Sequence, residues 1–410
     1  MRYRDVNALA DISRDAAAVV DFIGQSEYLS SLEAIGRSLR AKGFVTPFDD
    51  AMFSLELDLL NLEVLRTRSS GMFQSLPERC HRGVDFLIGL GQTIPVLSVA
   101  AKTRLLGRLR KGLKEGLWPL YHELRVAASL SKRGWNIHFH DFEEEGGYDF
   151  LATQNGKMFE VEAKTISAFT GWAIKPENLN KLLVEVKQHF VWKDANTIPL
   201  VGLKLLSTLL PNRVQLGQLV AAFSEVAQTR GELSLSNARI RFMGIAPNLT
   251  PIQLMRASRN HSQMVRKTVL VNPQHPRLVL EIDSERPNQL ERKIVRTISE
   301  TAREQFSRAN PGVIWTHIEF ISNEDFTNLS STQNAQVCFL DRIANAALLS
   351  EKRTHLGQLV FSGGSFLSKG GSAARSSYAR AVYNSPACRF GESFIFPEGR
   401  RKPLPERSIA

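Results

Sequence analysis

Cysteine is scarce in this chain of 410 residues, which has only Cys80, Cys338 and Cys388. No two of them form a Cys-x-x-Cys pair, which argues against a zinc ribbon or a disulfide scaffold and favours a reducing compartment. Long apolar runs are also absent. The first residues carry no apolar signal segment, and no run approaches the roughly 20 apolar residues that span a bilayer. We therefore expect a cytoplasmic protein that does not span a membrane.

Several common catalytic and phosphate-binding signatures are missing as well. There is no Gly-x-Ser-x-Gly elbow and no dinucleotide fingerprint. The segments Ser362-Gly-Gly-Ser365 and Lys369-Gly-Gly-Ser372 are rich in glycine, but they lack the Walker spacing that ends in Gly-Lys-Ser/Thr. We expect a flexible loop there. A basic, poorly packed tail should follow from residue 383 onward, including Arg400, Arg401 and Lys402.

Positive charge is in excess. The chain has 52 Lys and Arg against 41 Asp and Glu, a formal net charge of +11. Such an excess favours a polyanionic partner, most simply nucleic acid, although basic proteins without such a partner are common. The length is compatible with two to three domains, and the apolar and charged fractions are those of an ordinary globular protein.

A tight β-hairpin is the strongest local signal in the sequence. Asn155-Gly156 lies between two β-prone segments, and both residues tolerate the positive φ that a two-residue turn requires. Such a turn pairs Gln154 with Lys157. The same register places Asp149 opposite Glu162.

One face of this hairpin is charged and the other is apolar, because side chains alternate across a strand. The charged face carries Asp149, Leu151, Glu160, Glu162 and Lys164. The apolar face, which we expect to be core, carries Phe150, Ala152, Phe159, Val161 and Ala163.

The two opposed carboxylates should repel each other. With Cβ atoms about 5 Å apart, the repulsion is roughly 3 kcal/mol at an effective dielectric of about 20. A bound hard cation such as Mg²⁺, which prefers carboxylate oxygens, would convert that repulsion into attraction. Lys164 adds a positive charge beside the pair. The alternative is an ordinary solvated hairpin face, on which Glu and Lys are common.

These residues resemble the signature of the PD-(D/E)XK nuclease superfamily. Asp149 is followed, after twelve residues, by Glu162-Ala163-Lys164. The superfamily often has a further Glu on its first helix, and Glu123 lies in the right order. Tyr148 stands where the superfamily has its Pro, which is often absent there. The resemblance covers roughly residues 116–206.

The helix that would carry Glu123 has its own sequence signals. Pro119 suits the first helical position, and Gly134 suits the helix end. Glu123 falls within an apolar stripe at helical spacing, so it should point inward, where it could also serve a core polar network. The stripe consists of Leu120, Leu124, Ala127 and Leu130. A strand over 135–140 follows, which gives the order of helix and three strands found in the superfamily core.

The resemblance implies a metal-dependent nuclease that hydrolyses DNA. Asp149, Glu162 and the carbonyl of Ala163 would bind Mg²⁺ or Mn²⁺, and Glu123 would bind a second ion or hold a water. Lys164 would orient or help deprotonate the attacking water. RNA is not excluded as a substrate. A homodimer is one arrangement left open, since such enzymes often dimerise to cut both strands.

Two alternatives to an enzyme remain. One is a catalytically inactive nucleic-acid-binding protein that retains a nuclease-like fold. The other is a scaffold whose N-terminal helices bind another protein.

A basic amphipathic helix precedes the hairpin region. Residues 101–114 interleave Leu105, Leu106, Leu109 and Leu113 with six cations: Lys102, Arg104, Arg108, Arg110, Lys111 and Lys114. These cations could contact nucleic-acid phosphates beside the site. A membrane-surface helix and a packed helix with a solvated basic face are the alternatives.

The predicted fold class is α/β, with a restriction-endonuclease-like mixed β-sheet core flanked by helices and preceded by a mostly helical N-terminal region. We expect a helical region over 1–115, a nuclease-like domain over 116–360 with core motifs at 119–206, and the loop and tail over 361–410. Further elements should be a helix from Pro176, strands over 200–206, 240–245, 278–283 and 313–320, and a helix over 288–309. The sequence does not decide whether these strands extend the same sheet or build a second α/β unit.

Other constellations are weaker. Gln188, on the helix from Pro176, falls opposite its apolar stripe and is expected to be solvated. Glu281 and Asp283 share a strand face but lack a partner lysine. His138 and His140 share a strand face beside an acidic turn, where metal binding is an alternative to a polar edge strand.

Overall fold

The computed structural model divides the chain into two compact units. Unit 1 consists of Met1–Glu33, Leu55–Ser167 and Glu291–Ala410, and unit 2 of Ala34–Ser54 and Ala168–Leu290. The structure describes residues 9–42, 44–45, 55–64, 81–167, 174–194, 197–207, 209, 212–247, 267–271, 278–285, 289–319, 321, 323–331, 338–349, 351–368, 375–391 and 394–396. These units do not follow the predicted boundaries 1–115, 116–360 and 361–410, because residues 168–290 interrupt the expected nuclease-like domain.

The N-terminal part of the chain is helical, as expected. Its described segments contain the helices α1 (Leu9–Ile23), α2 (Gln25–Lys42), α4 (His81–Thr93), η2 (Ile94–Val96), α5 (Val99–Glu115) and α6 (Trp118–Lys132), and residues 55–64 are also helical. The two-residue strand β1 (Phe44–Val45) interrupts them. The predicted basic helix is α5, and the hydroxyl of Ser98 caps it by accepting a hydrogen bond from the Ala101 amide, 3.1 Å away.

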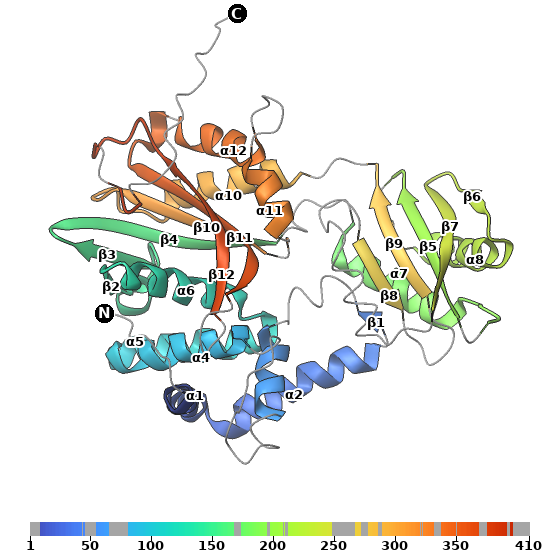
Figure 1. The fold of residues 1–410 in the computed structure, drawn as a ribbon, viewed down its shortest axis with the longest axis horizontal. Coiled ribbons are helices and arrows are strands. Elements are labelled where there is room, and N and C mark those ends of the chain that lie inside the picture. The colour runs from blue at the N-terminus through green and yellow to red at the C-terminus, as the bar shows by residue number, and fades with distance from the viewer. Residues whose placement is uncertain are drawn as a thin grey trace, which may run out of the picture. The chain divides into compact units, whose positions relative to one another are not determined.

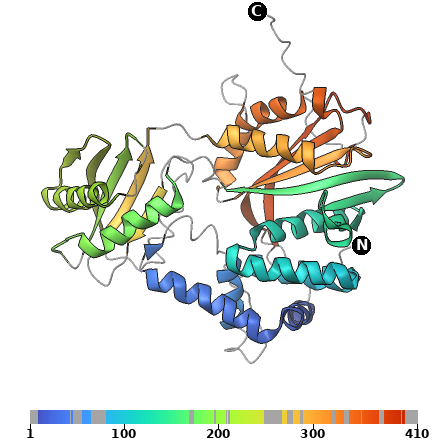
Figure 2. The same cartoon turned by 180° about the vertical axis from the view of Figure 1, so that it is seen from behind.

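Unit 1 is built around a six-stranded mixed sheet with the order β12-β11-β10-β4-β3-β2. The strands are β2 (Asn136–His138), β3 (Phe150–Gln154), β4 (Lys157–Ser167), β10 (Gly312–Glu319), β11 (Leu356–Ser368) and β12 (Arg375–Asn384). β4, β10 and β11 run parallel, and the remaining pairs are antiparallel. Every residue of β10 is buried, as a central strand covered on both faces requires. Figures 1 and 2 show α4, α5 and α6 on one side of this sheet and α10 and α12 on the other.

The predicted hairpin is present with the predicted register. β3 pairs with β4 from Gln154 opposite Lys157 to Phe150 opposite Val161. The turn residues Asn155 and Gly156 have φ of 50° and 77°, as a type I′ turn requires. The apolar face is core, as predicted, because all five of its side chains are buried: Phe150, Ala152, Phe159, Val161 and Ala163.

The helices on the other side of the sheet follow the sequence pattern less closely at their ends. They are α10 (Leu290–Glu304), α11 (Asn323–Ser330), α12 (Phe339–Leu348) and the short η4 (Glu351–Arg353). The predicted stripe of α10, namely Leu290, Ile294, Ile298 and Ala302, is fully buried. This helix ends earlier than the predicted residue 309, and Arg308 beyond it has a positive φ of 65°.

Unit 2 has a six-stranded sheet of its own, with the order β1-β8-β9-β5-β7-β6. Its elements are α7 (Pro176–His189), β5 (Thr197–Leu205), α8 (Arg213–Thr229), β6 (Glu232–Ser234), β7 (Ala238–Pro247), β8 (Lys267–Val271) and β9 (Leu278–Ser284). Apolar residues of α7 and α8 form a core with those of β5, β7 and β9. The strands predicted after residue 200 therefore divide between two sheets, since only β10 joins the sheet of the hairpin.

The flexible loop predicted from Ser362 is wrong where the structure describes it. Ser362-Gly-Gly-Ser365 lies inside β11, which pairs with β10 through Gly363 and with β12. A Cβ at Gly363 would lie 2.6 Å from Phe326 Cδ2 and 2.7 Å from Ile321 Cδ1, so glycine serves close packing here. Lys369-Gly-Gly-Ser372 lies outside the described residues.

The predicted poorly packed tail is wrong for residues 394–396. Phe394, Ile395 and Phe396 are buried. The Gln358 side chain holds this segment, because its Oε1 accepts hydrogen bonds from the amides of Ile395 (2.9 Å) and Phe396 (3.2 Å). Residues Arg400, Arg401 and Lys402 lie outside the described part of the chain. No helix among the described residues is long and apolar enough to cross a membrane.

Removal of the Phe159 side chain tests the core under the hairpin. Phe159 is 1% exposed and meets the Trp135 ring edge-on at a centroid distance of 5.4 Å. We expect Phe159→Ala to lower the free energy of unfolding by about 3–5 kcal/mol, measured by urea unfolding followed through tryptophan fluorescence. The neighbouring Met158, 46% exposed, is the control, and Met158→Ala should cost less than about 0.5 kcal/mol. Equal losses in the two variants would contradict this packing.

Candidate functional site

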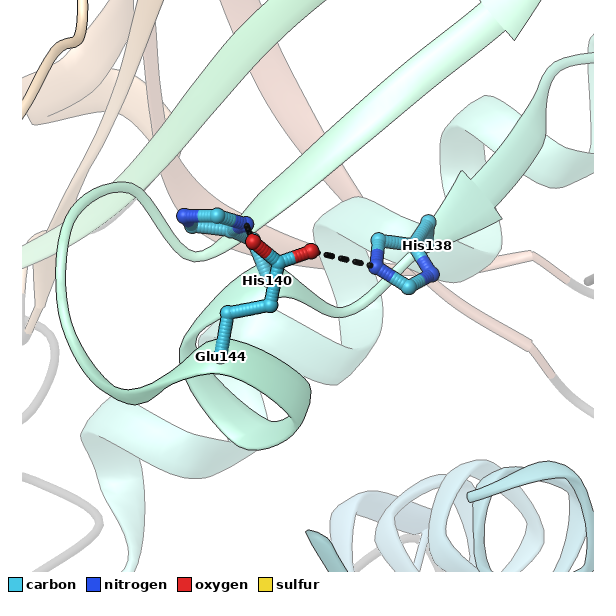
Figure 3. Close-up of side chains that lie close together, drawn as sticks. All are labelled: His138, His140 and Glu144. Atoms are coloured by element: carbon cyan, nitrogen blue, oxygen red, sulfur yellow. Dashed lines mark ion pairs between the residues drawn. The ribbon is translucent and has the colours of Figure 1, made fainter. Parts of the chain in front are cut away.

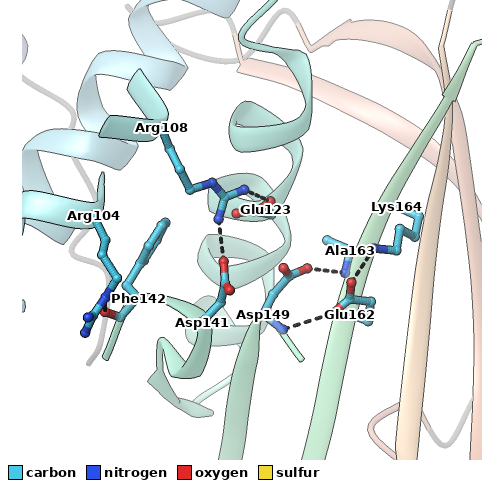
Figure 4. A network of polar contacts seen from close by, with 9 residues as sticks. All are labelled: Arg104, Arg108, Glu123, Asp141, Phe142, Asp149, Glu162, Ala163 and Lys164. Carbon is cyan, nitrogen blue, oxygen red and sulfur yellow. Dashed lines mark hydrogen bonds and ion pairs between the residues drawn. The ribbon is translucent and has the colours of Figure 1, made fainter. Parts of the chain in front are cut away.

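The hairpin brings Asp149 and Glu162 together through reciprocal contacts with the backbone. The Asp149 amide donates a hydrogen bond to Glu162 Oε2 at 3.0 Å, and the Ala163 amide donates to Asp149 Oδ2 at 2.6 Å (Figure 4). Asp149 directly precedes β3 and Glu162 lies within β4, so the register of the turn determines this pairing. Both side chains are buried.

Lys164 lies beside this carboxylate pair. Its Nζ donates to Glu162 Oε1 in an ion pair whose lysine side chain is 31% exposed. Burial by itself would lower the pKa of Lys164, but the carboxylates of Glu162, Asp149 and Glu123 outweigh that effect and raise it. The ammonium therefore stays protonated, which makes it a hydrogen-bond donor and a positive charge at the site.

Helix α6 supplies the third acid, Glu123. Pro119 lies in the first turn of this helix, and the predicted apolar stripe is buried together with Glu123. The Glu123 carboxylate accepts a hydrogen bond from the Arg108 guanidinium in a close ion pair. Arg108 Nη1 also donates to Asp141 Oδ2 at 2.8 Å, so one guanidinium bridges two acids (Figure 4).

The three acids interact electrostatically. Burial is the largest cause that raises the pKa of each. The pKa of Asp149 is raised well above its ordinary range by burial and then by the charges of Glu123 and Glu162. Glu162 reaches a pKa of about 7, because burial outweighs the opposing effect of Lys164. A cluster of this kind is poised to gain from an added cation.

The donor set suits a hard divalent cation. Mg²⁺ and Mn²⁺ prefer carboxylate and carbonyl oxygens, and Asp149, Glu162 and the Ala163 carbonyl offer both kinds. Each carboxylate oxygen has two lone pairs, so those that accept a backbone amide or the lysine keep capacity for a cation. Glu123 is different, because Arg108 already neutralises it.

The six cations predicted as a nucleic-acid surface do not act as one group. Arg104 donates to the Phe142 and Glu143 carbonyls, at 2.7 Å for Glu143, and Arg108 belongs to the carboxylate cluster. Arg110 pairs with Glu27 at 2.8 Å. On the rest of α5, Lys111 and Lys114 are exposed and Lys102 is half-buried.

Sequence reasoning missed two members of the network. The sequence predicts a phosphate contact for Arg108 and places Asp141 in the acidic turn that follows His140. The spacing of α5 gave one signal for Arg108, since it lies within one turn of the buried Leu105 and Leu109. The acidic segment Asp141–Glu145 forms a π-helical turn, η3, between β2 and β3, and the sequence carried no signal for it.

The weaker constellations lie in other places. Gln188 on α7 is exposed, as expected. Glu281 and Asp283 line a cavity of about 340 Å³ in unit 2 together with three cations: Lys204, Arg239 and Arg241. Glu232 also lines this cavity, so three acids there lie beside three cations.

Comparison with known proteins adds no relative. No family model, no curated protein and no solved structure matches this chain. The function can therefore be inferred only from the residues of the site.

The pH dependence of stability tests the burial of Glu162. Its raised pKa means that the folded state binds a proton more tightly than the unfolded state, so Glu162 stabilises the fold fully below about pH 4.5. This contribution is lost as the pH rises through about 7. In metal-free buffer, we expect Glu162→Gln to gain stability relative to wild type between pH 5 and pH 8, by up to about 3 kcal/mol.

Urea unfolding at the two pH values measures this effect. Glu300→Gln, whose side chain lies on the surface of α10, is the control and gives the baseline. A pH response of Glu162→Gln no larger than that of Glu300→Gln would contradict a protonated, buried Glu162.

Proposed function

We propose that this chain is a metal-dependent phosphodiesterase that cleaves DNA. The observation that carries the proposal is the convergence of Asp149, Glu162 and Lys164 on one hairpin, with Glu123 within their electrostatic reach. The order α6, β2, β3, β4, followed by the parallel strand β10, is compatible with a restriction-endonuclease-like core. We therefore propose that the chain is related to the PD-(D/E)XK superfamily.

The residues of the cluster would have different roles in hydrolysis. Asp149, Glu162 and the Ala163 carbonyl would hold Mg²⁺ or Mn²⁺, which polarises the phosphoryl oxygen and lowers the pKa of bound water. Lys164, protonated and partly exposed, donates a hydrogen bond to the attacking water or to a phosphoryl oxygen. Its charge stabilises the negative charge that develops in the transition state.

The positive net charge of the chain supports nucleic acid as the substrate class. The chain carries a net charge of +11, and phosphodiester backbones are the polyanions such an excess attracts. Lys111 and Lys114 on α5 are exposed and could contact phosphates. RNA has the same phosphodiester group, so RNA is tested beside DNA as a substrate. The oligomeric state is measured in the same experiments, because a homodimer is also proposed.

A second candidate is a nucleic-acid-binding protein without catalytic activity. The observation that favours it is the ion pair of Arg108 with Glu123, in which a protein cation neutralises one of the three acids. This candidate predicts salt-dependent binding of nucleic acid without cleavage.

Cleavage assays with single-residue variants distinguish the two candidates. Linear, supercoiled, single-stranded and branched DNA, and RNA, are incubated with Mg²⁺ or Mn²⁺. We expect Asp149→Ala and Lys164→Ala each to reduce the cleavage rate at least about 100-fold. Lys157→Ala is the control, because Lys157 is exposed at the hairpin turn and lies outside the cluster. Cleavage that survives both substitutions would exclude this site.

Arg108 determines how many ions the cluster can hold. Because it pairs with Glu123, we expect the carboxylate cluster to bind one Mn²⁺ in wild type and, in Arg108→Gln, a second through the released Glu123. Electron paramagnetic resonance and calorimetric titration measure the stoichiometry. Arg110→Gln is the control, since it removes one charge from an exposed pair on the same helix. One ion in both variants would show that Glu123 is not a potential ligand.

A further inference from the structure

A second group of ligand atoms lies around η3. His138 ends β2, His140 precedes η3, and Glu144 lies within η3. The Glu144 carboxylate lies between the two imidazoles, with 3.5 Å from Oε1 to His138 Nε2 and 3.3 Å from Oε2 to His140 Nδ1 (Figure 3). One ligand atom from each of the three residues lies within 4.8 Å of the others.

We propose that His138, His140 and Glu144 bind a divalent transition metal, with Zn²⁺ as the fitting ion. Ligand atoms about 2.1 Å from a tetrahedral metal lie about 3.4 Å apart. The separations of 3.5 Å and 3.3 Å, each from one imidazole to a different oxygen of the Glu144 carboxylate, are close to that spacing. Two imidazole nitrogens and one carboxylate oxygen are a donor set that suits Zn²⁺ better than Mg²⁺. The site is therefore distinct in chemistry from the all-oxygen carboxylate cluster.

One of the three ligands, His140, is held in place before any ion binds. The His140 ring stacks on Tyr148 with a centroid distance of 4.2 Å and an angle of 12°. On the Gly147 backbone, whose φ is 82°, a Cβ would lie 3.3 Å from His140 Cδ2, so glycine leaves room for the ring. The orientation of His140 towards Glu144 is thus set by its surroundings.

The π-helical turn that carries Glu144 is also fixed. The neighbouring Glu143 carboxylate accepts a hydrogen bond from the Ser98 amide at 3.0 Å. Arg104 donates to the Glu143 carbonyl at 2.7 Å. Contacts from α5 therefore position η3 against β2, which reduces the ordering that metal binding would otherwise require.

The third ligand distinguishes this group from an ordinary His–Glu pair. His189 and Glu185 on α7 have the same 3.5 Å separation, and His189 is as exposed as His138. Within the described residues, however, that pair has no third ligand that would complete a group of three. With three protein ligands and exposed edges, the η3 site would leave a fourth position open to water or to a ligand from a partner.

Metal titration tests the proposal without any assay of cleavage. Zn²⁺ binding is measured by calorimetry, and Co²⁺ binding by the visible absorption of a tetrahedral nitrogen-containing site. We expect one Co²⁺ per wild-type chain to show this absorption. His138→Ala and Glu144→Gln should each weaken binding at least about tenfold. Glu144→Gln keeps the side-chain shape, so it separates loss of a ligand from loss of the turn.

Two matched variants complete the test. His189→Ala should leave binding unchanged, because it removes an exposed histidine from a two-residue pair. Asp149→Ala should also leave it unchanged, because it alters only the carboxylate cluster. Binding that is unaffected by His138→Ala and Glu144→Gln would overturn the proposal. If Asp149→Ala alone abolished binding, Zn²⁺ would belong to the carboxylate cluster, which contradicts this site and leaves the proposed function standing.

Discussion

The burial of three carboxyl groups in one place is the constraint on which the hairpin region of unit 1 depends. Like charges in a poorly solvated site repel, and each must be protonated or compensated. Two protein cations compensate them here: Lys164 from the same strand as Glu162, and Arg108 from a different helix. Because loss of one partner would leave the other charge buried and unpaired, this compensation ties the position of α5 to that of α6 and the hairpin.

Sequence predicts the parts of this arrangement that local chemistry determines. A two-residue type I′ turn requires positive φ at both central positions, which Asn155 and Gly156 tolerate, and a turn of this length sets the register that brings Asp149 to Glu162. Pro119 and the apolar stripe around Glu123 likewise set the start and the buried face of α6. In each case the interacting residues are near in sequence, or are linked by a turn that allows one register.

The parts that escaped prediction depend on tertiary contacts. The sequence pattern predicts a surface position for Arg108. In the fold, the packing of α5 against α6 and η3 brings its guanidinium to Glu123 and Asp141. Gly363 reads as part of a flexible segment, whereas it is a close-packed position against Phe326 and Ile321. The separate sheet of unit 2 escaped for a similar reason, since the pattern of β5 does not specify whether its neighbour is β4 or β9. The alternation of side chains identifies a strand, but the strand that pairs with it is determined by the tertiary fold.

The two cations at the carboxylate cluster differ in what they allow. Lys164 is a point charge on a partly exposed side chain, so its ammonium can donate to water or to a phosphate oxygen as well as to Glu162. Arg108 is bound to two acids and lies 5.1 Å over the Phe142 ring, so its release would cost several contacts at once. The same compensation that permits three buried acids leaves Asp149 and Glu162 as the two that Arg108 does not neutralise, which is why the proposed cation is assigned to them. The cluster therefore combines a lysine paired with Glu162 and an arginine paired with two acids, which differ in how many contacts their release would break.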